Sequence, residues 1–74
     1  MIDFALRGDH ITLEALLKAT GLASSGGAAK VLIVGGAVHV NGAVETRRSR
    51  KLRDGDEASL RDGGEPVRVR TGPR

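Results

Sequence analysis

Residues 24–53 read SSGGAAKVLIVGGAVHVNGAVETRRSRKLR and hold the clearest structural signals in this chain of 74 residues. Ser25, or alternatively Ser24, is of a type that caps the start of a helix, and Gly35-Gly36 is of a type that ends one. Asn41-Gly42 between valines is the strongest short signal for a β-hairpin. The stretch therefore predicts a helix that is followed directly by a hairpin.

The same segment carries the entire positive excess of the chain. The net charge is +3, and because residues 1–23 and 54–74 each sum to −1, segment 24–53 holds the remaining +5. Five of the seven residues from Arg47 to Arg53 are cationic. A polyanion is therefore the expected class of partner, and a solvated basic loop without a partner is the alternative interpretation.

The residues before this segment predict a strand and a helix. Residues 2–6 alternate between large apolar and other side chains, which is typical of a half-buried strand, and residues 7–9 form a turn signal. Thr12 is a suitable N-cap for a helix that Gly21 ends in the left-handed conformation. The buried face of this helix is expected to consist of three leucines: Leu13, Leu16 and Leu17.

The residues after the segment predict two more strands. Turn signals at 54–55 and 62–64 separate a weak strand at 57–60 from a second strand at 66–70. The valines of this second strand are expected to face the core and its arginines to face water. Residues 71–74 are expected to be a frayed end.

Together these elements predict an α+β fold, with two short helices packed on a small, mostly antiparallel sheet, in a single domain over residues 1–74. The chain has no cysteine and one aromatic residue, so aliphatic packing alone must stabilise it. No apolar run approaches the roughly 20 residues that span a bilayer, and the N-terminus lacks a leader pattern. We therefore expect a cytoplasmic protein with no membrane segment.

The sequence shows no metal-ligand spacing, nucleotide-binding loop or catalytic motif. We therefore expect no enzymatic activity, no cofactor, no metal and no small-molecule substrate.

The predicted start of the second helix is a candidate phosphate site. Gly26 and Gly27 leave the first turn without side chains, and the first N–H groups of a helix are unpaired and lie at its positive end. Ser25 caps this turn, and Lys30 follows on the same face. Close packing of the two helices through the glycines is the alternative explanation.

The arginine-rich segment after the hairpin is the second candidate. Arginine binds phosphate through two parallel hydrogen bonds and stays charged at physiological pH. With Phe4 as the only aromatic, and that one expected in the core, stacking on single-stranded bases is not expected, and folded or double-stranded RNA fits better. The candidate contacts on the hairpin and in this segment are His39, Asn41, Arg47, Arg48, Arg50 and Lys51.

The order of two short helices, then Gly36 to Gly42, then Gly55-Asp56, resembles the RNA-binding domain named after small-subunit ribosomal protein four, or alpha-L motif, whose core would cover about residues 12–60. More narrowly, residues 40–48, VNGAVETRR, resemble the stand-alone bacterial YbcJ-type members. The resemblance implies an α+β fold that binds RNA, including rRNA, along the second helix and the hairpin. It implies contacts at Ser25, Lys30, Arg47, Arg48 and Lys51.

The chain departs from this resemblance at two places. Most members of the wider family have arginine where this chain has Gly26, so the helix would rely on backbone N–H groups and Lys30. The narrower family tends to have a basic residue at position 49 and none at position 50, whereas this chain has Ser49 and Arg50. In an extended segment, that exchange moves one charge to the opposite side.

The leading hypothesis is a non-enzymatic module that recognises structured RNA through its phosphates. The alternative is a protein-interaction module whose basic strip binds an acidic partner protein. The sequence does not predict an oligomeric state.

Overall fold

The first helix begins and ends where its capping residues predict. In the computed structural model, which describes residues 2–71, α1 spans Leu13–Thr20. Thr12 Oγ1 accepts the N–H of Ala15 at 3.3 Å, and Gly21 closes the helix at φ 80°. The three predicted leucines are fully buried and form the centre of the core.

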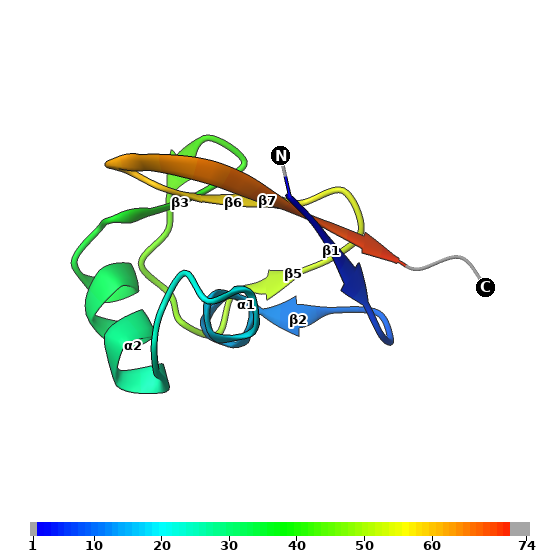
Figure 1. Cartoon of the computed structure of the whole chain (residues 1–74), viewed down its shortest axis with the longest axis horizontal. Coiled ribbons are helices and arrows are strands. Elements are labelled where there is room, and N and C mark those ends of the chain that lie inside the picture. The colour runs from blue at the N-terminus through cyan, green and yellow to red at the C-terminus, as the bar shows by residue number, and fades with distance from the viewer. Residues whose placement is uncertain (1, 72–74) are drawn as a thin grey trace.

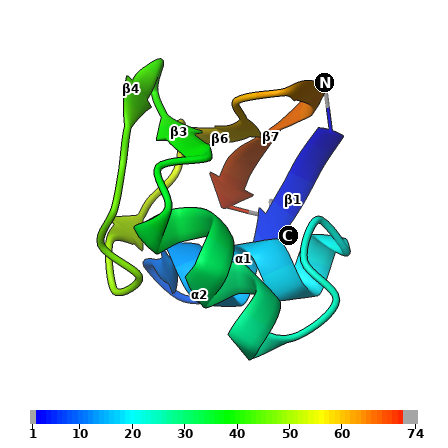
Figure 2. The same ribbon diagram turned by 90° about the vertical axis from the view of Figure 1, so that its left-hand side faces the viewer.

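The second helix, α2 (Gly26–Val34), confirms the predicted capping at Ser25. Ser25 Oγ accepts the N–H of Ala28 at 3.1 Å, and Gly36 takes a φ of 81° just beyond the helix. Ala29 and Ile33 are fully buried and supply the inner face of α2. Figure 2 shows α2 crossing α1, with both helices below the sheet.

The predicted hairpin joins β3 (Val38–Val40) to β4 (Ala43–Val44) through Asn41 and Gly42. These two residues have φ of 53° and 86°, and a turn with two positive φ values matches the twist of the strands that it connects. Val38 and Val40 are buried, whereas His39 between them is only half-buried. The alternation predicted for this strand is therefore confirmed.

The hairpin belongs to a five-stranded mixed sheet in the order β1-β7-β6-β3-β4. The other strands are β1 (Ile2–Leu6), β6 (Glu57–Leu60) and β7 (Gly63–Thr71). β1 runs parallel to β7, and the remaining pairs are antiparallel. Figure 1 shows this sheet above the two helices, so the predicted fold class is confirmed.

A second, two-stranded sheet was not predicted. β2 (Ile11–Thr12) pairs antiparallel with β5 (Lys51–Leu52) immediately before α1. Strands of two residues are too short to show an alternating pattern, so the sequence gives no signal for them. Because β5 follows the arginine-rich residues, this pairing places the basic segment beside the start of α1.

The core lies between the helices and one face of the five-stranded sheet. On β7, Val67 and Val69 are fully buried, whereas Arg70 is exposed on the opposite face. Arg68 is only half-exposed, because it donates a 2.8 Å hydrogen bond to Glu57 on β6.

The expectation of a frayed end at residues 71–74 is wrong for Thr71, which lies in β7. Both its N–H and its hydroxyl donate to Asp54 Oδ1, at 2.8 and 3.1 Å. Residues 72–74 lie outside the described residues. Within residues 2–71, neither helix is long enough to cross a bilayer, and no group of three or more histidine, aspartate and glutamate side chains is placed to hold a metal ion.

Candidate nucleic-acid interface

The backbone of the arginine-rich segment is fixed to the start of α1. The carbonyl of Arg50 accepts the N–H of Leu13 at 2.9 Å, and the carbonyl of Arg48 accepts the N–H of Glu14 at 3.2 Å. These N–H groups belong to the first turn of α1, which has no partner for them within the helix. The segment is therefore held by the fold and is not a free loop.

Residues 47–50 form a turn, in which the N–H of Arg50 donates to the carbonyl of Arg47 at 3.3 Å. The expectation that an extended segment would place the charge of residue 50 on the opposite side is therefore wrong. The turn brings Arg47 and Arg50 to the same carboxylate, that of Glu45.

Glu45 is a buried carboxylate that holds both arginines. Its residue is 7% exposed, and its own N–H continues the hairpin ladder to the carbonyl of Val38 at 3.0 Å. Oε2 accepts the N–H and Nε of Arg47 at 3.0 Å each. Oε1 accepts Nη2 of Arg47 at 3.1 Å and Nη1 of Arg50 at 2.8 Å.

These contacts change the pKa values of Glu45 and Arg47. Hydrogen bonds from the side chain and then the backbone of Arg47, with a further one from Arg50, lower the pKa of Glu45 to about 2 although burial opposes the shift. The same carboxylate raises the pKa of Arg47. The cluster is therefore fully ionised at neutral pH, with two positive charges on one negative charge.

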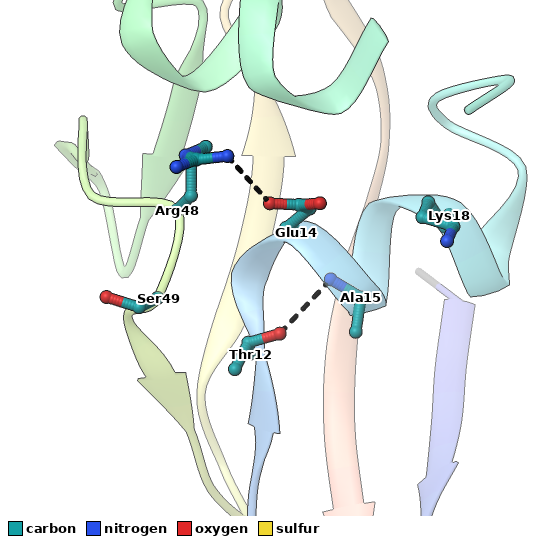
Figure 3. A pocket seen from close by; sticks show the side chains of 6 residues that line it. All are labelled: Thr12, Glu14, Ala15, Lys18, Arg48 and Ser49. Carbon is teal, nitrogen blue, oxygen red and sulfur yellow. Dashed lines mark hydrogen bonds and ion pairs between the residues drawn. The ribbon is translucent and has the colours of Figure 1, made fainter. Parts of the chain in front are cut away.

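Glu14 places a second carboxylate between the arginine segment and α2. Its Oε1 lies 3.6 Å from Nη1 of Arg48. Figure 3 marks this ion pair with a dashed line. Oε2 of Glu14 would lie 3.2 Å from a Cβ atom built on Gly26. Arg48 and the first turn of α2 therefore lie on either side of one carboxylate and belong to one surface region.

The two glycines of α2 have different surroundings. A Cβ at position 26 would lie 3.2 Å from Glu14 Oε2 and 3.8 Å from Lys18 Cδ, so side chains of α1 crowd this position. A Cβ at position 27 would meet only Ser25 Oγ, at 3.8 Å, so packing does not account for Gly27. The N–H groups of these glycines find no acceptor within residues 2–71.

The remaining candidates differ in their setting. Lys30 is exposed on α2. His39 lies on the sheet face opposite the buried valines of β3, away from the helices. Asn41 uses its side chain inside the fold: Nδ2 donates to Asp56 at 3.0 Å, and Oδ1 accepts the N–H of Glu57 at 2.9 Å.

Two hollows flank the 47–50 turn. The first, the α1 hollow, has a volume of about 400 Å³ and is shown in Figure 3; it is lined by Thr12, Glu14, Ala15, Lys18, Arg48 and Ser49. The second, the basic hollow, has a volume of about 520 Å³ and is lined by Arg47, Ser49, Arg50, Lys51 and Arg53.

Sequence reasoning included Arg53 in the arginine-rich segment but not among the candidate contacts, although it lines the basic hollow. It did not select Ser49, which lines the same hollow, or the two carboxylates that pair with the arginines, Glu14 and Glu45. The charge count already contained a signal for Glu45, because it is the one anion in segment 24–53. Glu14 gave no such signal, because its contact depends on the fold.

Comparison with known proteins gives a consistent set of relatives. A family model described as the S4 domain matches residues 4–70. The YbcJ proteins of Escherichia coli (strain K12) and Shigella flexneri are each 41% identical over 70 residues, covering 93% of this chain and 97% of theirs. The solution structure of E. coli YbcJ matches with a TM-score of 0.71 and 40% identity, covering 96% of this chain and 89% of that one. It is described as revealing an alfaL motif involved in RNA-binding.

Proposed function

This chain belongs to the S4 domain family, and from that premise we propose that it is a non-enzymatic RNA-binding module that recognises structured RNA through its phosphates. The observation that supports the proposal most is the fixed arginine segment, whose backbone is bonded to the start of α1. Basic side chains on a rigid support bind a polyanion with a smaller loss of conformational entropy than a flexible loop does.

The ion pairs within the surface leave donors for RNA. A guanidinium has five N–H donors. Arg47 donates one from Nε and one from Nη2 to Glu45, so three donors remain available to RNA. Its side chain is 70% exposed although it is paired. Within residues 2–71, Lys30, Lys51 and Arg53 have no carboxylate within ion-pairing distance of their side chains, and they add unpaired positive charge.

The proposed contacts are mainly to phosphate, because the chain is rich in arginine at residues 47–53 and has one aromatic residue. Phe4, the one aromatic residue of the chain, is partly buried against the core, so the chain has no set of aromatic side chains on which successive single-stranded bases could stack. Phosphate contacts position a protein on a nucleic acid without reading its sequence. We therefore propose folded or double-stranded RNA as the ligand, and rRNA or a ribosomal particle as the first target to examine.

Salt dependence tests the proposal. If the surface neutralises about four phosphates, the slope of log affinity against log salt concentration for a short RNA duplex should be about −3. Arg48→Ala should reduce the magnitude of this slope by about 0.8, whereas Arg70→Ala, on the opposite sheet face, should leave it unchanged. Absence of binding, or binding without a salt slope, would exclude the proposal.

A second measurement separates RNA from an acidic partner protein. The tagged chain is used to capture partners from bacterial lysate with and without ribonuclease. Capture of RNA that ribonuclease abolishes supports the proposal, whereas a protein partner that ribonuclease does not release would favour the protein-interaction alternative.

A further inference from the structure

The basic hollow gathers like charges around one open space. Four cations and the hydroxyl of Ser49 line it, and no carboxylate is among its lining residues. Like charges at close range destabilise each other unless an anion lies among them. In the fold, Glu45 supplies a negative charge to two of the four, from the buried side.

The other two cations of the hollow have no such partner. Within residues 2–71, no carboxylate lies within ion-pairing distance of the side chains of Lys51 and Arg53. Asp56 accepts the backbone N–H of Arg53 at 2.8 Å, but it makes no ion pair with the guanidinium of Arg53 within residues 2–71. The hollow therefore retains excess positive charge toward solvent.

Glu45 also determines which edge of Arg47 is available. The Nε–Nη2 edge of the guanidinium is directed at Glu45. The Nη1–Nη2 edge remains, and this edge can bind a second oxyanion through two parallel hydrogen bonds. A hydroxyl such as that of Ser49 can donate a further bond to the same anion.

We propose that the basic hollow binds one phosphate group of the RNA backbone and that Glu45 is the positioning residue that holds Arg47 and Arg50 in place for it. The inference rests on the proposed function, and it names a subsite that includes Ser49 and Arg53. The occupant is an internal phosphodiester of the RNA.

Because Glu45 is negatively charged, the change in RNA affinity of Glu45→Gln distinguishes a positioning role from a simple charge effect. Glu45→Gln removes one negative charge, and by electrostatic attraction alone this change would strengthen binding to any polyanion. A positioning role predicts the opposite, because an amide has one acceptor oxygen where the carboxylate has two, and its NH2 group would face the donors of the arginines. We expect Glu45→Gln to weaken binding of a short RNA duplex with 5′-hydroxyl ends roughly tenfold, the loss expected for one charge-assisted hydrogen bond. Equal or tighter binding by the variant would overturn the inference.

Two further variants keep the test valid if Glu45→Gln does not fold. Arg50→Lys retains the charge but loses the planar guanidinium, and Ser49→Ala removes an exposed hydroxyl. Both should weaken duplex binding, whereas Arg70→Lys, outside the hollow, should not. Amide NMR spectra of each variant report whether the fold is intact. Wild-type affinity in both Arg50→Lys and Ser49→Ala would overturn the inference.

Pyrophosphate separates failure of the subsite from failure of the proposed function. In the wild-type chain, titration with inorganic pyrophosphate should shift the amide signals of residues 47–53 in a saturable manner. If these signals shift but the duplex does not bind, the hollow is an anion site and the RNA function is wrong. If the duplex binds but pyrophosphate leaves these signals unchanged, the subsite is wrong and the RNA function stands. Binding that requires a 5′-phosphate on the duplex would overturn the assignment to an internal phosphodiester.

Discussion

Oε1 of Glu14 on α1 lies 3.6 Å from Nη1 of Arg48 in the turn after the hairpin, although 34 positions separate the two residues in the sequence. The same carboxylate borders the first turn of α2 at Gly26. The carboxylate of Glu14 therefore lies between Arg48 and the first turn of α2, both of which are candidate phosphate contacts. Any phosphate that approaches both groups must compete with it.

The first prediction concerns this competition. Glu14→Gln should strengthen RNA binding, because it frees Arg48 and removes repulsion of the phosphate. Asp62→Asn is the matched control, since it removes one negative charge at an exposed turn between β6 and β7. Duplex affinity measured at one salt concentration should rise more for Glu14→Gln than for the control. Equal gains in the two variants would indicate a net-charge effect alone.

The second prediction concerns Gly27, which no packing contact requires. The backbone at this position is helical, and a Cβ would make only an ordinary contact with Ser25 Oγ at 3.8 Å. Gly27→Ala should therefore raise the free energy of unfolding by about 0.5 kcal/mol. It should also weaken RNA binding, because the methyl group covers the first turn of α2. Urea denaturation and duplex titration measure the two effects, and unchanged affinity would show that RNA does not reach this turn.

The third prediction follows from the low pKa of Glu45. Because hydrogen bonds from Arg47 hold this pKa at about 2, the unfolded chain takes up the proton at a higher pH than the folded one. The stabilisation by Glu45 should be complete above about pH 5 and should be lost as the pH falls toward 2. Glu45→Gln should therefore lower the free energy of unfolding at neutral pH by about 1 kcal/mol and reduce it much less at about pH 3. An equal loss at both pH values would contradict the assignment.

Other carboxylates contribute to acid sensitivity in both proteins. Hydrogen bonds from Thr71 lower the pKa of Asp54, and the hydrogen bond with His10 lowers the pKa of Asp9. The difference between wild type and Glu45→Gln, and not the absolute loss of stability, is therefore the quantity to measure.

The fourth prediction assigns Asn41 to the fold. Asn41→Ala removes the bonds to Asp56 and Glu57 and places alanine at a φ of 53°. The free energy of unfolding should fall by about 1–2 kcal/mol, with RNA affinity of the folded protein unchanged. Asn41→Gly is the control, since it loses the same side-chain bonds but tolerates the backbone conformation. Reduced affinity in a fully folded Asn41→Ala variant would instead support a contact with RNA.

The elements that sequence reasoning predicted correctly are those with local signals. Thr12, Ser25 and Gly21 act within one helical turn, and Asn41-Gly42 shapes its own hairpin. Such residues determine backbone conformation through neighbours a few positions away. The two helices and the hairpin could therefore be predicted without knowledge of the tertiary structure.

The elements that were missed depend on contacts between distant residues. The pairing of β2 with β5, and the bonds from Leu13 and Glu14 to the arginine segment, join residues that lie far apart in the sequence. For the same reason, the basic charges could be counted from the sequence, but their pairing with Glu14 and Glu45 could not. The side on which Arg50 lies was predicted wrongly, because the turn at residues 47–50 is closed by a hydrogen bond from Arg50 to Arg47 that the sequence does not signal.

The parallel pairing of β1 with β7 has a consequence for folding during synthesis. β1 is made before the other strands of this sheet, but its partner β7 is made after them, so Ile2 can pair with Val67 only after all the intervening elements have been made. Closing so long a segment is slow in comparison with forming local helices and hairpins. The nascent chain can therefore assemble α1, α2 and the hairpin while β1 is still unpaired, and β1 joins the sheet only after β7 has been made.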